Sequence, residues 1–446
     1  MLAAIALSVA LQNAVQANKT PAAEIGVVRS GKLIVDDAYG MANLKQKVPA
    51  TPQTQFEIGS VTKQFTAAAI LQLKEQGKLD LGDSLGKYVP EYARGKDITI
   101  EQLLWQVSGV PNYTDVSHFV HIAGTTPGGV DPAIALIAKK PLDFKPGTRF
   151  EYSNTNYILL GAVVARVSHM PWETYIRKNI FEPTGMMRSG FIQDEPSMPD
   201  VATGYSRGKK GRLQVAPPLN GPWAGAAGGI VSTVSDMAKW DTAFYGGKIV
   251  SSQDVALATT PHQLSSGKST GYGFGWFIMK KADQPEIAHS GGTFGFASEN
   301  EYFPNLHEFV IVLTNVAGLD PGFIADQTFD ALNPAIAAAE KTPAKGEDPA
   351  ITALAKQWVH RMQTGDIDKS QLSASFAKHL TPDAVNGMKE GLAPLGNPTS
   401  FVYRGKSTAN GATAYQYSVN FKGASLDLTI AVDSQGKISA LGIGGD

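Results

Sequence analysis

The order of strand-like and helix-like patterns along the chain restricts its fold more than any other feature. Residues 25–39 (IGVVRSGKLIVDDAY) form two strand-like runs joined at Ser30-Gly31, which predicts a β-hairpin. Helix-like patterns fill the middle of the chain, and strand-like runs return from about residue 270: GYGFGWFIM, EIAHSGGTFGF, ASENEYF and HEFVIVLTNV. Because strands and helices are segregated, the sequence predicts an α+β fold with an antiparallel sheet flanked by helices, not alternating βαβ units.

The helix predicted over residues 60–76 is expected to be buried. Apolar side chains surround it nearly completely beyond its first turn, which is typical of a helix with no solvent-facing side, and Gly77 ends it. Other helices are predicted after the capping box of Thr99 and Gln102, after residue 154, and after a Thr233 cap.

The length of 446 residues exceeds what one hydrophobic core usually serves, so at least two domains are expected. Residues 1–338 are predicted to form the main domain, and residues 339–350 (AEKTPAKGEDPA) read as a linker. Residues 351–446 contain two helical stretches followed by the strands SFVYRGK, TAYQYSVNF and SLDLTIAVD. They are therefore predicted to be a small α+β accessory domain.

Charge and cysteine content exclude several classes of partner and cofactor. The chain has 39 basic and 40 acidic residues without a long basic run, so nucleic acid is not an expected partner. It contains no cysteine, which excludes disulfides, Cys-ligated zinc, iron–sulfur clusters and a thiol nucleophile. No apolar stretch approaches the ~20 residues of a membrane span.

The amino-terminal segment has two interpretations. Residues 1–17 (MLAAIALSVALQNAVQA) have a short apolar run and small residues at Val15 and Ala17 that suit signal-peptidase cleavage. They lack the preceding Lys or Arg of an ordinary signal peptide, so the segment can equally be the first helix of the mature protein. The sequence leaves both interpretations open.

Six Ser-x-x-Lys sequences occur, and only the one at Ser60 has a suitable local structure. Residues three apart on a helix are neighbours, and a serine at a helix start lies near unpaired backbone N–H groups. The sequences starting at Ser84, Ser206, Ser265 and Ser434 contain a central glycine and read as turns, and the one at Ser375 lies near the end of its helix. Ser60 begins a long buried helix, where burial would lower the pKa of Lys63 and make it a general base. The alternative is that Lys63 is an ordinary solvated lysine.

Two further short motifs follow in the chain. Tyr152-Ser153-Asn154 is the sole Tyr-x-Asn, and a phenol beside an ammonium group is expected to have a lowered pKa that suits proton transfer. The Asn154 amide can both donate to and accept from a substrate amide. His289-Ser290-Gly291 is the sole His-x-Gly and lies on a predicted strand, where His289 and Gly291 share one face. Each motif alone is equally explained by a turn or a strand end.

Two competing site motifs have the wrong context. Gly267-Lys-Ser269-Thr-Gly271 matches the nucleophile elbow of α/β-hydrolases, but a strand-like run follows it where that fold requires a helix. His118 and His121 have helical spacing without an evident third ligand, so no metal site is predicted.

The motifs, in this order, resemble those of the serine β-lactamase and penicillin-binding protein superfamily. The chain is most similar to its class C-like branch, which includes D-Ala-D-Ala carboxypeptidases, D-aminopeptidases and esterases. The resemblance extends from residue 25 to about 320 through the blocks TQFEIGSVTKQFTAAAILQLKEQGKLDLGDSLGKYVPE, ITIEQLLWQVSGVPNY, PGTRFEYSNTNYILLGAVV, AAGGIVSTVSDMAKW and HSGGTFGF. It implies a β-lactamase/transpeptidase-like fold with a helical subdomain.

The resemblance also implies roles for individual residues and a class of reaction. Ser60 would be the acylated nucleophile, activated by Lys63, with Tyr152 as base or proton shuttle. Asn154 and the third motif, from His289 to Gly291, would bind the substrate. The backbone N–H groups of Ser60 and Gly292 would form the oxyanion hole. The implied substrate is a small molecule or short peptide, no cofactor is implied, and the family's usual location is the periplasm or outside the cell.

Two departures from the family pattern shape the functional prediction. Histidine at 289 argues against a true β-lactamase, because a permanently charged lysine there suits the carboxylate of a β-lactam, whereas histidine is only partly charged near neutral pH. Gln106 and Val107 stand where many relatives have histidine and threonine, which predicts a structural adjustment near the pocket.

The predicted function is a serine hydrolase acting on amide bonds of D-amino-acid-type substrates, with a carboxylesterase as the alternative. A non-catalytic sensor of the same fold would be expected to lose Ser60, Lys63 or Tyr152, and all three are present. The loops at 110–145 and 190–225 are expected to shape the pocket. The oligomeric state is left open.

Overall fold

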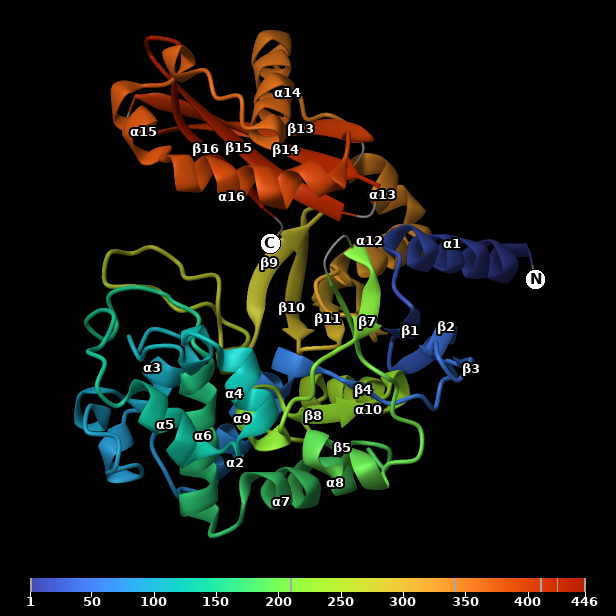
Figure 1. Ribbon diagram of the computed structural model, residues 1–446, viewed down its shortest axis with the longest axis vertical. Coiled ribbons are helices and arrows are strands. Elements are labelled where there is room, and N and C mark those ends of the chain that lie inside the picture. Colours follow the sequence, from blue (N-terminus) through green and yellow to red (C-terminus); the bar gives the residue numbers. More distant parts are fainter. Residues whose placement is uncertain (1, 209–210, 341, 410, 423, 445–446) are drawn as a thin grey trace. The chain divides into compact units, whose positions relative to one another are not determined.

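The computed structural model describes residues 2–208, 211–340, 342–409, 411–422 and 424–444 (Figure 1). Its contacts divide the chain into two compact units. The large unit comprises Lys19–Ala325, and the small unit comprises residues up to Asn18 together with those from Asp326 onward. The expected division at the linker 339–350 stays a prediction, and residues 1, 209–210, 341, 410, 423 and 445–446 of the expected ranges lie outside the described residues.

The large unit is built on a seven-stranded antiparallel sheet with the order β3-β2-β1-β12-β11-β10-β9. Segments from opposite ends of the unit pair at its centre, where Ile25 of β1 lies opposite Val312 of β12. The strands are β1 Ala22–Arg29, β2 Lys32–Asn43, β3 Val48–Pro49, β9 Phe277–Lys281, β10 Gln284–Gly292, β11 Ala297–Phe303 and β12 Glu308–Thr314. The predicted α+β class with an antiparallel sheet is thus confirmed.

Turn chemistry fixes where these strands begin and end. The predicted hairpin is confirmed, because Ser30 (φ 49°) and Gly31 (φ 76°) form the left-handed turn between β1 and β2. The strand predicted from residue 271 is wrong in its first half. Gly271 (φ 69°) and Gly275 (φ 92°) adopt left-handed conformations that interrupt an extended chain, so β9 begins only at Phe277.

The predicted buried helix is confirmed as a 3₁₀ turn, η1 Gly59–Val61, followed by α2 Thr62–Glu75. Nearly every α2 residue from Thr62 to Leu73 is buried. The helix packs against α6 Asn154–Ser168 and α9 Gly221–Gly228, and Phe65 stacks on Trp240 at 4.0 Å. Burying one such aromatic side chain is worth about 1.5–3 kcal/mol, so α2 is a fixed support for the residues at its start.

The other elements of the large unit surround α2 and the sheet. The predicted capping box of Thr99 and Gln102 and the Thr233 cap are both present. The remaining helices are α3 Ile100–Leu104, α4 Phe119–Thr125, α5 Val130–Ile137, α7 Trp172–Ile176, α8 Glu182–Thr184, α10 Val234–Tyr245 and α11 Ser252–Ala258, with α12 Gly322–Leu332 at the boundary. Short strands β4 Phe56–Glu57, β8 Ile230–Ser232 and β5 Gly190–Phe191 form one small sheet, and β6 Tyr205–Arg207 pairs with β7 Leu213–Val215.

The small unit has its own core around a four-stranded antiparallel sheet. Its elements are α1 Leu2–Asn18, α13 Pro334–Glu340, α14 Pro349–Thr364, α15 Ala374–His379, α16 Pro382–Leu392, β13 Ser400–Ala409, β14 Ala412–Phe421, β15 Ala424–Asp433 and β16 Ile438–Gly444. The sequence interpretation missed α16 and β16, whose glycines weaken their periodic patterns.

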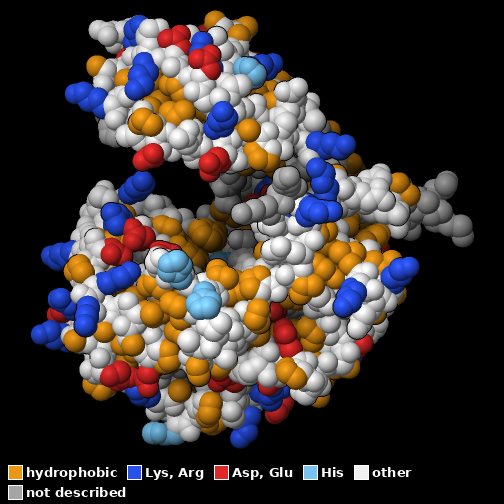
Figure 2. Space-filling view, viewed as in Figure 1, with side chains coloured by type: hydrophobic (Ala, Val, Ile, Leu, Met, Phe, Trp, Pro, Cys, Tyr) orange, Lys and Arg blue, Asp and Glu red, His pale blue; other side chains and the backbone are white. Residues whose placement is uncertain are grey.

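The described part of the chain contains no helix with both the length and the apolar character needed to cross a bilayer. On the face shown in Figure 2, basic and acidic side chains are interspersed among apolar and uncharged ones instead of forming a continuous basic stripe.

Candidate active site

Ser60 and Lys63 are held together at the start of the buried helix. Lys63 is 0% exposed, and its Nζ donates to Ser60 Oγ at 2.9 Å, to Asn154 Oδ1 at 2.8 Å and to the carbonyl oxygen of Ala227 at 2.8 Å. The three-residue spacing places both side chains on one face, as predicted. Three acceptors occupy all three N–H groups of the ammonium form, which fixes Nζ beside the serine oxygen.

Burial sets the protonation of Lys63. Desolvation holds the pKa of its amine well below the ordinary lysine value. All three hydrogen-bond acceptors are neutral groups, so no carboxylate offsets this shift. The amine is therefore able to give up its proton and accept one from the adjacent Ser60 hydroxyl, which is the property that the sequence predicts for a general base.

Tyr152 lies over the same lysine, with Lys63 Nζ 4.8 Å from the centre of its ring. Its buried hydroxyl has no hydrogen-bond partner among the described residues. Burial raises the pKa of the Tyr152 phenol, and the neighbouring Ser60 hydroxyl opposes this shift only in part. The predicted lowering of this pKa is wrong, because desolvation outweighs the opposing effect of the Ser60 hydroxyl. The phenol consequently carries its proton and is a hydrogen-bond donor.

The Tyr-x-Asn loop is held in place by a side chain that the sequence interpretation did not assign to the site. Gln106 Oε1 accepts hydrogen bonds from the Ser153 backbone N–H at 3.0 Å and from Asn156 Nδ2 at 2.5 Å. Gln106 is 0% exposed and adopts a left-handed backbone conformation (φ 60°) that is uncommon for a non-glycine residue. The departure at Gln106 was the available signal, and its two hydrogen bonds form a clamp on residues 153–156. That this clamp is an adjustment relative to other family members stays a prediction.

A second pair of contacts orients Asn154 at the start of α6. Its backbone N–H donates to Asn112 Oδ1 at 3.1 Å, and its Nδ2 donates to Thr114 Oγ1 at 3.3 Å. Because Oδ1 accepts from Lys63, the amide orientation is fixed from both ends. The predicted residues Ser60, Lys63, Tyr152 and Asn154 thus come together in one cluster.

His289 lies behind this cluster on β10. Its Nδ1 donates to the carbonyl oxygen of Ser290 at 2.6 Å, so Nε2 is the acceptor for the Tyr272 hydroxyl at 3.1 Å. Burial and, secondarily, the charge of Lys63 lower the pKa of the His289 imidazole to about 3. The expected partial charge near neutral pH is therefore wrong, and the ring is a neutral, fixed group. Its predicted role in substrate binding stays a prediction.

Glycines allow the end of β10 to lie against η1. A Cβ on Gly291 would fall 2.0 Å from the carbonyl oxygen of Ile58, and one on Gly59 (φ 50°) would fall 2.4 Å from the Gly292 nitrogen. Only residues without a Cβ fit this approach. It brings the Gly292 backbone next to the turn that carries Ser60, which is the neighbourhood that an oxyanion hole requires. That the backbone N–H groups of Ser60 and Gly292 form this oxyanion hole stays a prediction.

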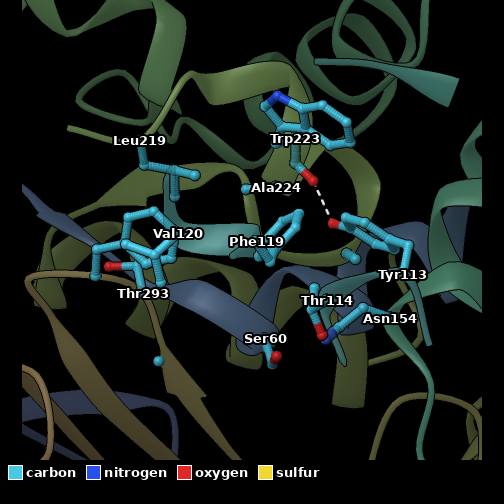
Figure 3. Close-up of a pocket in the computed structure, with 14 residues that line it drawn as sticks. Ser60, Tyr113, Thr114, Phe119, Val120, Asn154, Leu219, Trp223, Ala224 and Thr293 are labelled. Carbon is cyan, nitrogen blue, oxygen red and sulfur yellow. Dashed lines mark hydrogen bonds between the residues drawn. The ribbon is translucent and has the colours of Figure 1, made fainter. Parts of the chain in front are cut away.

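A cavity of about 360 Å³ opens over Ser60 (Figure 3). Asn154 and Gly292 also line it, whereas Lys63, Tyr152, His289 and Gly291 do not. Most of the other lining residues fall in the two loop regions expected to shape the pocket or follow Gly292: Tyr113, Thr114, Phe119, Val120, Leu219, Trp223, Ala224, Thr293 and Phe294. The remaining two, Ala227 and Gly228, lie just beyond the second expected loop.

The competing motifs do not form sites in the described residues. Ser269 lies in the connection between α11 and β9 and not between a strand and a helix. No group of three or more His, Asp or Glu side chains with metal-binding geometry is found in the described part of the chain.

Comparison with known proteins places this geometry in a family. A family model described as Beta-lactamase matches residues 9–333. PbpX of Bacillus subtilis (strain 168) is 31% identical over 291 residues, covering 65% of this chain and 69% of PbpX. Protein flp of Staphylococcus aureus (strain MRSA252) is 29% identical over 316 residues, and this chain spans only 62% of its length.

Two solved structures extend the likeness to three dimensions. The octameric penicillin-binding protein homologue from Pyrococcus abyssi superposes with a TM-score of 0.66 at 24% identity, covering 96% of both chains. The D-stereospecific amidohydrolase from Streptomyces sp. superposes with a TM-score of 0.64 at 25% identity, covering 73% of this chain and 98% of that one. The chain therefore belongs to the beta-lactamase family and is a serine hydrolase of that fold.

Proposed function

We propose that the protein hydrolyses amide bonds of D-amino-acid-type substrates through an acyl-enzyme on Ser60. The observation that carries this proposal is the contact of 2.9 Å between the Ser60 hydroxyl and the fully buried amine of Lys63. A serine beside a base of lowered pKa is an activated nucleophile.

Acylation begins when the neutral Lys63 amine takes the hydroxyl proton of Ser60. The Ser60 oxygen then bonds to the substrate carbonyl carbon, and the oxyanion that forms accepts hydrogen bonds from the backbone N–H groups of Ser60 and Gly292. Such donors are typically worth ~3–4 kcal/mol each. As the carbon–nitrogen bond breaks, the protonated Tyr152 phenol donates its proton to the leaving nitrogen and regains one from the Lys63 ammonium, which restores both groups.

Deacylation needs only Lys63 as the proton carrier. A water molecule attacks the ester carbon and gives a proton to the neutral amine of Lys63. The carbon–oxygen bond to Ser60 breaks, and Ser60 regains its proton from the Lys63 ammonium. The products are a carboxylic acid and an amine, and no cofactor takes part.

The preference for D-amino-acid-type amides is supported by the likeness to the Streptomyces amidohydrolase. Carboxylesterase activity is the second candidate, because no charged side chain lines the cavity and an amino acid amide would bring an ammonium group into it. A location outside the cytoplasm, implied by the family resemblance, stays a prediction.

The test compares a D-amino-acid amide with a p-nitrophenyl ester in wild type and Ser60→Ala. A kcat/KM that favours the amide and disappears in the variant supports the first candidate. Ester cleavage with negligible amide turnover, again lost in the variant, establishes the esterase. Mass spectrometry of the quenched reaction should show the acyl adduct on the peptide that contains Ser60. Turnover that persists in Ser60→Ala refutes the proposed mechanism.

A further inference from the structure

We infer that the cavity over Ser60 selects acyl groups that carry an uncharged aromatic or bulky apolar side group and discriminates against acyl groups whose side group carries a carboxylate. The inference rests on the proposed function, because it assigns the acyl part of the substrate to this cavity. It goes further by naming the chemistry of that part.

Aromatic rings form one side of the cavity. Phe119 lies edge-on to Tyr113 at 5.3 Å and to Trp223 at 5.7 Å between ring centres. The Tyr113 hydroxyl donates to the Trp223 carbonyl oxygen (Figure 3). Trp223 Nε1 donates to the Thr126 carbonyl oxygen at 3.0 Å. The polar atoms of both large rings are thus bound to backbone, so the rings offer carbon surface to a ligand.

The lining contains no Asp, Glu, Lys, Arg or His side chain. Lys63, which contacts the lining residue Ser60, also bonds to Asn154 and the Ala227 carbonyl, so its N–H groups are occupied. A side-group carboxylate that enters such a site loses its hydration without gaining a counter-ion, which is costly. An uncharged ring loses only unfavourable contact with water.

The size of the cavity fits this class of acyl group. Apolar cavities of ~150 Å³ are large enough for benzene, and this one is about 360 Å³. Val120, one of the lining residues, is 49% exposed, so the apolar surface continues to the solvent. A phenyl-bearing chain can therefore enter from outside and still leave room for the reacting carbonyl at Ser60.

The experiment uses three p-nitrophenyl esters that share one leaving group: acetate, 3-phenylpropanoate and hydrogen succinate. We expect kcat/KM for the phenylpropanoate to exceed that for the acetate at least tenfold, and that for the succinate to fall below it. A matching order of inhibition is expected for 2-phenylethyl-, methyl- and 2-carboxyethylboronic acid, which bind the serine without a leaving group. A hydrogen succinate ester that reacts faster than the acetate would overturn the inference.

A charge placed at the cavity should change this order. Val120→Arg supplies a cation beside the cavity at an exposed position, so we expect the ratio of succinate to acetate turnover to rise at least tenfold. Val48→Arg is the matched control, because Val48 is 45% exposed on β3 and does not line the cavity. An unchanged ratio in Val120→Arg overturns the inference.

Turnover of the acetate ester distinguishes a failure of the inference from a failure of the proposed function. Ser60-dependent acetate turnover without the expected order of the three esters refutes the inference and leaves the acyl-enzyme intact. Absence of any Ser60-dependent turnover refutes the proposed function and the inference with it.

Discussion

At the scale of single residues, the site depends on what burial does to ordinary side chains. Lys63 has no acidic partner among its bonds and is fully buried, so its amine loses affinity for a proton. The same burial keeps the Tyr152 phenol protonated. One environment therefore shifts the two pKa values in the directions that make one group a base and the other an acid.

Lys63→Arg should abolish the general base while keeping a cation. The guanidinium does not deprotonate at accessible pH, so kcat/KM should fall by about 10²–10⁴-fold. In wild type, kcat/KM should rise with pH through the lowered Lys63 pKa, because the protonated amine cannot accept the serine proton. Lys74→Arg on the same helix is the control, since Lys74 pairs with Asp254 and should tolerate the change. Equal pH–rate profiles in Lys63→Arg and wild type would contradict this role.

Gln106→Leu should loosen the Tyr-x-Asn loop. The substitution leaves the Ser153 N–H and Asn156 Nδ2 without their acceptor, at a cost of about 1–3 kcal/mol each. Urea denaturation should show this loss, and kcat should fall more than KM rises because Asn154 contacts the base. Gln106→Glu, which retains an acceptor oxygen at the same place, should recover part of kcat. A stable Gln106→Leu protein with wild-type kcat would remove Gln106 from the positioning of the loop.

At the scale of elements, the site depends on the close packing of β10 on the turn η1. Gly291 faces the Ile58 carbonyl oxygen, which accepts a hydrogen bond from Ser298 Oγ of β11 at 2.8 Å. The two strands and the turn thus share one contact. The position of the Gly292 N–H relative to Ser60 follows from this packing.

Gly291→Ala should separate β10 from η1. Its Cβ would lie 2.0 Å from the Ile58 carbonyl oxygen and 2.4 Å from Ser298 Oγ, so backbone must move, at about 1–3 kcal/mol. Thermal unfolding of Gly291→Ala should show the loss. Gly292→Ala is the control for stability, because a Cβ there meets no atom within 4 Å. Similar melting temperatures for the two variants would show that the contact is adjustable.

The carboxyl groups of Glu57 on β4 and of the half-buried Glu195 on the short helix η6 Ile192–Ser197 interact electrostatically. Burial and their mutual repulsion raise the pKa of Glu57 to about 8, and burial raises the pKa of Glu195 to about 7. Because the folded state holds these protons more tightly than the unfolded state, stability is greatest below the ordinary glutamate pKa and falls as pH rises to about 8.

Glu57→Gln should flatten this pH dependence. The neutral amide cannot ionise, so the free energy of unfolding of the variant should decrease less between pH 5 and 8 than that of wild type. Chemical denaturation at several pH values measures the difference. A variant whose stability falls with pH as steeply as that of wild type would show that this pair is not the source.

At the scale of the whole molecule, the chain contains two separate hydrophobic cores. One belongs to the large unit, and the other gathers residues of the small unit around the fully buried Trp358. A unit with its own core is in principle able to fold alone. The predicted accessory domain is therefore testable by unfolding.

Trp358→Ala should lower one of two unfolding transitions in calorimetry. Removing a buried tryptophan typically costs about 3–5 kcal/mol, and Trp358 also donates from Nε1 to Gln371 Oε1 at 2.7 Å. The transition of the large unit and the ester kcat/KM should stay unchanged. A single transition that shifts as a whole would show that the two units unfold together.

The sequence by itself determined the elements and the order of the motifs. The Ser30-Gly31 hairpin, the buried helix after Ser60 and the caps at Thr99 and Thr233 follow from periodicity and turn chemistry, which act over a few residues. Ser60 and Lys63 share a face for the same reason. The same reasoning did not predict α16 and β16, because glycines interrupt the periodic patterns of these two elements.

Only the tertiary structure decided the chemistry of the site. Lys63 meets Asn154 and Ala227 across 91 and 164 residues of chain, and these contacts create the burial that sets its pKa. The neutral state of His289, the protonated Tyr152 and the clamp by Gln106 arise in the same way. A local pattern specifies which side chains are present, whereas desolvation depends on every segment packed around them.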